Sequence, residues 1–198
     1  MNKIEFWFDF GSNYSYLSMM RIGPLAKAAG VQVERKPFML GPIFKSLGWE
    51  TSPFVLQPLK GAYVWRDMER QCAKYALRWQ RPTTFPRSAL LAARVALQGE
   101  GASWLEGFCE QVMLANFVHD RDINDEPVIA GILTALGADA AAIIAQARSE
   151  PCKAALRART DQAQARGIFG APMFFVGDEM FWGNDRLEDA LALAAHQP

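Results

Sequence analysis

The sequence predicts an α/β protein in which strands near the two ends of the chain flank an all-helical middle. Three observations carry this prediction: an aromatic-rich, partly alternating segment at residues 3–10, apolar residues at helical spacing through the middle, and a hairpin signal at residues 173–182. A length of 198 residues fits one compact domain, or one domain with a sizeable insertion.

The beginning of the chain predicts a strand–helix–strand unit. Residues 3–10 are rich in Phe and Trp and interpreted as a strand. Ser12 or Asn13 can cap a helix that runs to about Ala29. Residues 31–36 are expected to form a second strand, which completes a βαβ unit.

The middle of the chain is expected to be helical after an initial loop. Proline and glycine punctuate residues 37–59, which we interpret as a long ordered loop. Apolar residues then recur at helical spacing, and a bundle core explains them better than a cofactor site. The stripes are Met68, Cys72, Tyr75, Ala76 and Trp79, then Trp104, Leu105, Phe108, Cys109, Val112 and Met113, then Val128, Ile129, Ile132, Leu133 and Leu136, with Ala-rich continuations at 138–148 and 152–166.

The end of the chain predicts a hairpin followed by a closing helix. Residues 173–176 and 179–182 are expected to be strands joined by a Gly-Asp turn. Asp185 and Glu188 have the spacing of a capping box at the start of the closing helix.

This order is what a thioredoxin-like fold with a large all-helical insertion gives. We expect residues 1–37 and 167–198 to form a discontinuous thioredoxin-like domain, and residues 38–166 to be the loop plus the helical insertion.

Charge and composition exclude several classes of function. The 21 basic residues balance 21 acidic ones, which argues against a dominant nucleic-acid surface or a basic membrane-binding face. No stretch approaches the ~20 apolar residues of a membrane span, and Glu5 and Asp9 interrupt the apolar run that a signal peptide needs. We therefore expect a cytoplasmic protein.

Cysteine and histidine usage argues against a disulfide framework and a metal site. Cys72, Cys109 and Cys152 are far apart and form no C-x-x-C, so they are interpreted as reduced thiols packed in the core. The histidines, His119 and His196, are too few for a His-rich metal site.

The first candidate site lies at the junction of the first strand and helix. A helix N-terminus favours an anion or thiolate, and in thiol oxidoreductases a C-x-x-C stands at this junction. Here the pattern is Ser12-x-x-Ser15. Ser12 is either a simple helix cap or a group that stabilises a bound anion.

Two further candidates lie near the end of the chain. On pattern alone Pro172 is expected to be trans, whereas a cis bond would leave the backbone of Ala171 free to pair with a peptide-like ligand. In the segment Trp182, Gly183, Asn184 and Asp185, backbone N–H groups with Asn184 could hold a carboxylate and Asp185 an α-ammonium; simple helix capping is the alternative.

Together these motifs resemble the 2-hydroxychromene-2-carboxylate isomerases and the kappa-class glutathione transferases, in the DsbA-like branch of the thioredoxin fold. The resemblance covers essentially the whole chain. It is strongest in F-D-F-G-S-N-Y-S-Y-L at residues 8–17 and in G-I-F-G-A-P-M-F-F-V-G-D-E-M-F-W-G-N-D-R-L at residues 167–187. Asn13 departs from the family, whose serine is often followed by proline.

The resemblance implies a glutathione site. Its catalytic serine falls on Ser12, as a stabiliser of the glutathione thiolate. The backbone that holds the cysteinyl part falls on Ala171, with Pro172 as the cis-proline. The segment that grips the γ-glutamyl end falls on Trp182, Gly183, Asn184 and Asp185.

The resemblance also implies an aromatic carboxylate as substrate. Lys45 is expected to hold its carboxylate, Trp49 or Trp65 to stack on its ring, and Ser88 to lie nearby. The implied activity is glutathione-dependent cis–trans isomerisation of 2-hydroxychromene-2-carboxylate to trans-o-hydroxybenzylidenepyruvate, or of a related aromatic catabolite. The alternatives are a kappa-class-like glutathione transferase and a glutathione-binding DsbA-like protein without isomerase activity. A homodimer is a further expectation.

Overall fold

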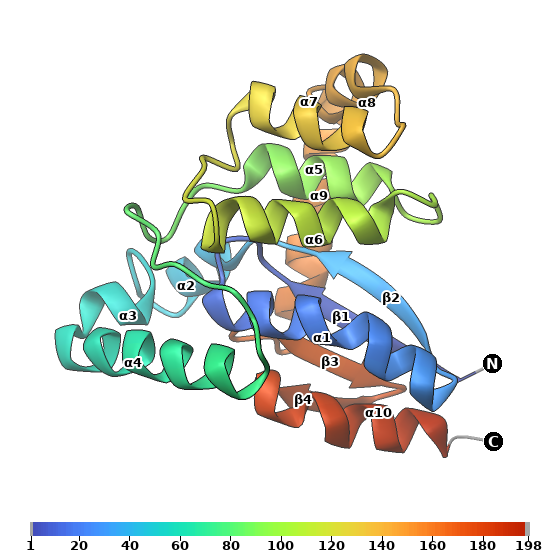
Figure 1. Ribbon diagram of the computed structural model, residues 1–198. Helices are drawn as coiled ribbons and strands as arrows, with labels where there is room; N and C mark the ends of the chain where they lie inside the picture. The colour runs from blue at the N-terminus through green and yellow to red at the C-terminus, as the bar shows by residue number, and fades with distance from the viewer. Residues whose placement is uncertain (1, 197–198) are drawn as a thin grey trace.

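A four-stranded mixed sheet organises residues 2–196, the part of the chain that this computed structural model describes. β1 pairs in parallel with β2, β3 is antiparallel to both β1 and β4, and the order is β2-β1-β3-β4. The strands are β1 (Lys3–Phe8), β2 (Gln32–Pro37), β3 (Met173–Val176) and β4 (Glu179–Trp182). The two ends of the chain therefore meet at the centre of one sheet (Figure 1), and the fold is the thioredoxin-like one that the sequence predicts.

The alternating side chains of the sheet form two cores. Ile4, Phe6 and Phe8 face the main core, which α1 (Asn13–Ala29) and α10 (Leu187–Ala195) cover. Trp7 faces the other side, where the buried residues are Phe38, Ile43, Ala163, Ile168, Met173 and Phe175. Aromatic side chains fill both faces because a strand buried on both sides gains apolar contact from each successive residue.

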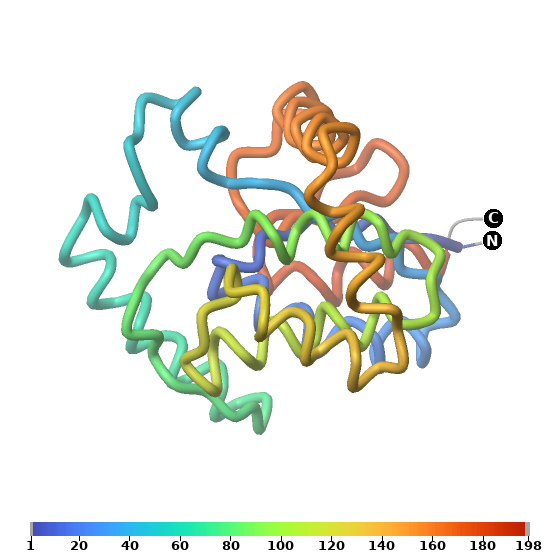
Figure 2. Tube along the Cα trace, turned by 90° about the horizontal axis from the view of Figure 1, so that it is seen from above, coloured from blue at the N-terminus to red at the C-terminus, as the bar shows by residue number. Residues whose placement is uncertain are grey.

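The helices between β2 and β3 form two groups (Figures 1 and 2). The helices α5 to α8 pack above the sheet, and α9 runs from them down behind the sheet, where Ala163 joins the second core. The helices α2 to α4 lie to one side of the sheet, next to the N-terminus of α1. Their bounds are α2 (Leu40–Ser46), α3 (Pro53–Leu56), α4 (Pro58–Lys74), α5 (Leu90–Gln98), α6 (Leu105–Phe117), α7 (Glu126–Ala135), α8 (Ala140–Ala147) and α9 (Glu150–Ala165). None of the helices within residues 2–196 has both the length and the apolar character to cross a membrane.

The expected long loop at residues 37–59 is wrong in part, because it contains α2 and α3. Ile43 anchors α2 in the second core. Ser52 caps α3 by accepting a hydrogen bond from the N–H of Phe54, and Pro53 begins the helix. The frequent prolines here start short helices rather than preventing them.

Two further sequence predictions fail at helix ends. The stripe that continues to Trp79 does not exist, because α4 ends at Lys74 and Ala76 has a positive φ of 54°. The capping box at Asp185 and Glu188 is also absent: a short 3-10 turn, η1 (Asn184–Arg186), precedes α10, whose first residue has no side-chain cap.

Candidate active site

A cavity of about 1200 Å³ opens at the N-terminus of α1. One side, which we call the catalytic wall, consists of the loop and first turn at residues 9–14 together with residues 169–172 and 180–186. The other side, the helical wall, consists of cavity-lining residues of α2, α3, α4 and the segment between α2 and α3. Residues 85–88 also line the cavity.

Ser12 is both the N-cap of α1 and a cavity residue. Its Oγ accepts a hydrogen bond from the N–H of Ser15 (3.2 Å) and donates one to the carbonyl oxygen of Ala171 (3.1 Å). The two sequence interpretations of Ser12 are therefore compatible, since capping uses the lone pairs of the hydroxyl and leaves its hydrogen for an acceptor across the cavity.

Asp9 joins the catalytic wall to the helical wall. Its carboxylate accepts hydrogen bonds from the N–H of Gly11 and from the N–H of Leu40, both at 2.7 Å. Burial raises the pKa of Asp9 above its usual value, against the lowering effect of these two hydrogen bonds. The side chain thus fixes the loop before Ser12 relative to the first residue of α2.

The Ala171–Pro172 bond faces Ser12 and is cis. This geometry agrees with the resemblance and differs from the trans bond that the local pattern favours. Within residues 2–196 the N–H of Ala171 donates no hydrogen bond, and its carbonyl pairs only with the side chain of Ser12. Ala171 therefore presents backbone groups with which an extended peptide can pair.

Close packing at two glycines shapes the segment after β4. Gly183 has a φ of 103°, which disfavours other residues, and its N–H donates to the carbonyl of Pro172 (3.0 Å). A Cβ on Gly170 would lie 2.7 Å from Nε1 of Trp182. Trp182 is 55% exposed, packs edge-on against Phe169 and lines the cavity.

Asn184 and Asp185 line the cavity but differ in burial. Asn184 is buried, and its side-chain oxygen accepts hydrogen bonds from Ser18 (3.2 Å) and Arg21 (2.9 Å) of α1. The carboxylate of Asp185 is exposed and forms an ion pair with Arg186 at 3.2 Å. Asn184 therefore fixes this segment to α1, and Asp185 offers an accessible negative charge.

The helical wall carries polar groups that the sequence analysis missed. Lys60, Asp67 and Gln71 line the cavity from one face of α4. The hydroxyl of Tyr14 donates to the carboxylate of Asp67 (2.8 Å), and burial together with this carboxylate raises the pKa of Tyr14 well above its usual value. Lys60, Asp67 and Gln71 have the i, i+7, i+11 spacing of one helix face, and this spacing could have indicated them. A search for apolar periodicity alone does not detect a polar face.

Comparison with known proteins identifies the family. Residues 3–193 match the DSBA-like thioredoxin domain. The chain belongs to this family. It is 34% identical over 188 residues to a 2-hydroxychromene-2-carboxylate isomerase of Sphingobium xenophagum, with 93% of this chain and 94% of the relative covered. The resemblance to these isomerases is therefore confirmed.

Two solved structures show the same fold. A 2-hydroxychromene-2-carboxylate isomerase superposes with a TM-score of 0.88 at 24% identity, covering 96% of this chain and 93% of its own. The cytosolic disulfide reductase DsbM from Pseudomonas aeruginosa, solved with GSH, gives 0.67 at 15% identity, covering 96% of each chain.

Unlike a disulfide reductase, this DSBA-like chain brings no protein thiol to the cavity within the residues that the structure describes. Cys72, Cys109 and Cys152 are buried and free, and none of them lines the cavity. Burial raises the pKa of Cys72 to about 11 and that of Cys109 to about 12, so both stay protonated at neutral pH. The hydroxyl of Ser12 stands at the helix terminus instead.

The structure separates the expected substrate-binding residues. Trp49 and Ser88 line the cavity, and Trp49 packs against Phe44. Lys45 does not line it, because it lies on the exposed side of α2, and the cavity lysine is Lys60. Trp65 does not line this cavity either: it is 9% exposed and stacks on Trp79 with ring centroids 5.9 Å apart.

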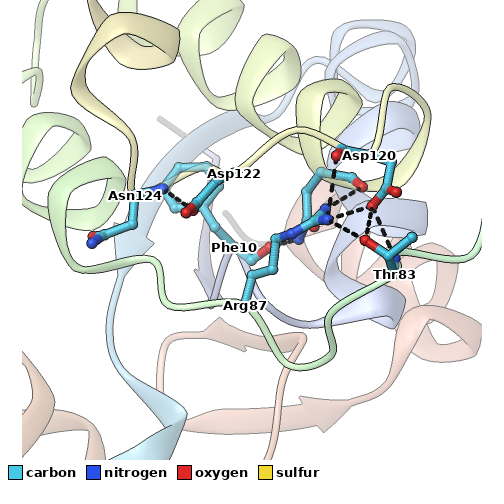
Figure 3. A network of polar contacts seen from close by, with 7 residues as sticks. Phe10, Thr83, Arg87, Asp120, Asp122 and Asn124 are labelled. Atoms are coloured by element: carbon cyan, nitrogen blue, oxygen red, sulfur yellow. Dashed lines mark hydrogen bonds and ion pairs between the residues drawn. The ribbon is translucent and has the colours of Figure 1, made fainter.

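A polar network holds residues 85–88 in place (Figure 3). The guanidinium of Arg87 pairs with the carboxylate of Asp120 and donates to Oδ1 of Asn116 (3.0 Å), and Asn116 donates to the carbonyl of Phe10 (3.0 Å). Hydrogen bonds from the N–H of Thr83 and from Arg87 hold the pKa of Asp120 below its usual value. The network ties residues 85–88 to the loop that follows β1.

Proposed function

We propose that this protein is a glutathione-dependent isomerase that converts 2-hydroxychromene-2-carboxylate, or a related aromatic catabolite, to trans-o-hydroxybenzylidenepyruvate or its counterpart. The observation that carries the proposal is the Ser12 hydroxyl, placed at the N-terminus of α1 opposite the cis Ala171–Pro172 bond where no protein thiol is present. The name of the 34% identical relative supports the isomerase activity.

The donor set of the catalytic wall fits glutathione. The unpaired N–H of Ala171 suits the cysteinyl backbone, and Asp185 suits the α-ammonium of the γ-glutamyl end. The volume of about 1200 Å³ exceeds the ~300–1000 Å³ of common small-molecule sites, which leaves room for an aromatic substrate beside the tripeptide.

Bound glutathione would supply the thiolate that adds reversibly to a conjugated double bond of the ring-opened substrate, so that the resulting single bond can rotate before elimination of the thiolate restores the double bond. The task of the protein is to favour this thiolate. A thiol with a pKa of about 8.5 is only a few per cent ionised at neutral pH, and lowering the pKa by ~2 units takes about 2.7 kcal/mol.

Ser12 supplies part of this free energy. A hydrogen bond to a charged acceptor contributes about 1.5–3 kcal/mol. The Ser12 hydroxyl has one hydrogen, which it donates to the carbonyl of Ala171. Rotating the hydroxyl toward the glutathione sulfur breaks this bond and costs about 0.5–1.5 kcal/mol. The N-terminus of α1 adds ~0.3–1 kcal/mol. At the middle of these ranges the sum is about 1.9 kcal/mol, below the requirement of about 2.7 kcal/mol, which leaves a place for a further donor.

The helical wall suits the substrate. Lys60 supplies a positive charge for a carboxylate, and the rings of Trp49 and Phe44 supply an apolar surface for an aromatic ring. In this proposal Lys60 takes the role that the sequence analysis expected for Lys45.

The test is an assay of 2-hydroxychromene-2-carboxylate with enzyme dialysed free of thiols, with and without added glutathione. We expect turnover only with glutathione. Equal turnover without any thiol would refute glutathione dependence, and faster conjugation of an aryl halide than isomerisation would favour the transferase alternative.

A further inference from the structure

Asn13 is a buried hydrogen-bond donor with no partner. It is 1% exposed and lines the cavity, and its Nδ2 makes no hydrogen bond within residues 2–196. The other described residues with a buried side-chain atom that makes no hydrogen bond are Ser15, Arg35, Arg94 and Arg159, of which Arg159 forms an ion pair with Glu100. All four lie outside the cavity lining. Native proteins rarely leave such groups unpaired, so an unpaired donor in a cavity wall indicates an acceptor brought by a ligand.

Its place in the fold indicates which acceptor. Asn13 is the first residue of α1, directly after Ser12, and the first turn of this 17-residue helix contains no acidic side chain. The N–H groups of a helix N-terminus favour negative charge. The acceptor next to Ser12 is therefore expected to be anionic, as the thiolate of glutathione is.

The hydrogen bonds of Ser12 indicate why a bound anion would need a second hydrogen-bond donor. The single hydroxyl hydrogen of Ser12 is already directed at the carbonyl of Ala171. The Nδ2–H groups of Asn13 have no such competing partner, so a hydrogen bond from Asn13 to a ligand breaks none within the protein. Proline, which often follows the serine in the family that this chain resembles, has no side-chain donor at all.

We propose that the side-chain amide of Asn13 donates a second hydrogen bond to the sulfur of glutathione bound beside Ser12. Asn13 is then a thiolate-binding residue, and it lowers the pKa of the bound thiol together with Ser12. This inference rests on the proposed glutathione dependence, and it assigns a role to a residue for which helix capping alone gives no reason.

The test measures the pKa of enzyme-bound glutathione from the ultraviolet absorbance of its thiolate as pH is varied. In Asn13→Leu the pKa should rise by about one unit, which means roughly tenfold less thiolate at neutral pH. Asn13→Asp keeps the shape of the side chain without the amide donor, and should raise the pKa at least as far. It keeps the test valid where the leucine variant does not fold.

Ser15→Ala is the matched control. It removes a hydroxyl of the same helical turn that is likewise buried and unpaired, but that lies outside the cavity lining. The bound thiol should keep its wild-type pKa in this variant, and both Asn13 variants should keep the wild-type circular dichroism spectrum.

Two results would contradict the proposal in distinguishable ways. Folded Asn13 variants that bind glutathione with the wild-type thiol pKa would overturn the role of Asn13 alone. Wild-type enzyme that does not bind glutathione in a calorimetric titration, or binds it with an ordinary thiol pKa, would overturn the proposed function as well.

Discussion

The part of the catalytic wall around Ser12 differs from the helical wall in burial and in how it is fixed. Ser12, Asn13 and Asn184 are each at most 7% exposed, and hydrogen bonds between segments more than 150 residues apart join Ser12 to Ala171 and Ser18 to Asn184. On the helical wall, Tyr63 is 62% exposed. The residues proposed for the chemistry around Ser12 therefore have a rigid frame, whereas the surface proposed to select the substrate consists of the short helices α2 and α3 and the longer α4, with exposed side chains such as Tyr63.

Loss of the hydroxyl on the catalytic wall should have the largest effect. In Ser12→Ala we expect kcat to fall by ~10²–10³, because a donor to a developing charge is lost. Stability should fall by only ~1 kcal/mol, the usual cost of losing an N-cap. The measurements are steady-state kinetics at saturating glutathione and a denaturant titration.

Ser149→Ala is the control for this variant, since Ser149 caps α9 in the same way by accepting from the N–H of Cys152, away from the cavity. It should lose similar stability and keep its kcat. A full wild-type kcat in Ser12→Ala would remove the hydroxyl from the mechanism.

The network around Arg87 gives the second prediction, which concerns the segment between the walls. The Arg87 side chain is 7% exposed, and its replacement leaves the carbonyl and side chain of Asn116 without their donor. Arg87→Met should lower the Tm by on the order of 5 °C. Arg148→Met, which breaks an exposed ion pair with Glu126, should leave the Tm nearly unchanged in the same calorimetric scan.

The two lysines test the helical wall. Lys60→Met should raise the KM for the aromatic carboxylate about tenfold, the equivalent of ~1.4 kcal/mol, with kcat little altered. Lys45→Met should have the wild-type KM, because Lys45 does not line the cavity. A raised KM in Lys45→Met together with a wild-type KM in Lys60→Met would show that Lys45, and not Lys60, binds the carboxylate of the substrate.

Asp9, which joins the walls, gives the smallest effect. Because its pKa is raised in the folded state, the folded protein binds more protons than the unfolded one between the usual pKa of 3.8 and the raised value. Its contribution therefore favours folding at low pH and is lost as pH rises through this window. Denaturant titrations at several pH values should show this slope reduced in Asp9→Asn and kept in Asp178→Asn, a control in the exposed hairpin turn.

Local patterns were sufficient where a single segment decides the structure. Three features follow from a residue type and its immediate neighbours: the end of α1 at Ala29, the capping of α1 by Ser12, and the hairpin at residues 173–182. Prediction failed where distant residues decide. Ile43 makes α2 a helix by packing in the second core, and Trp79 leaves the expected helical stripe to stack on Trp65.

The site divides in the same way. Ser12, Ala171, Pro172 and residues 182–185 were identified as candidates from their motifs, and the structure brings them to one cavity. Lys60, Asp67 and Gln71 were missed because α4 shows its polar face to the cavity only after the chain has folded around it.

The sequence by itself determined the order of the strands, the serine at the start of α1 and the absence of a C-x-x-C, because these are properties of neighbouring residues. Only the tertiary structure decided which lysine faces the cavity, that Asp9 links two walls, and that the amide of Asn13 is buried without a partner. The physical reason is that burial and hydrogen-bond pairing depend on segments far apart in the chain, and no local pattern contains them.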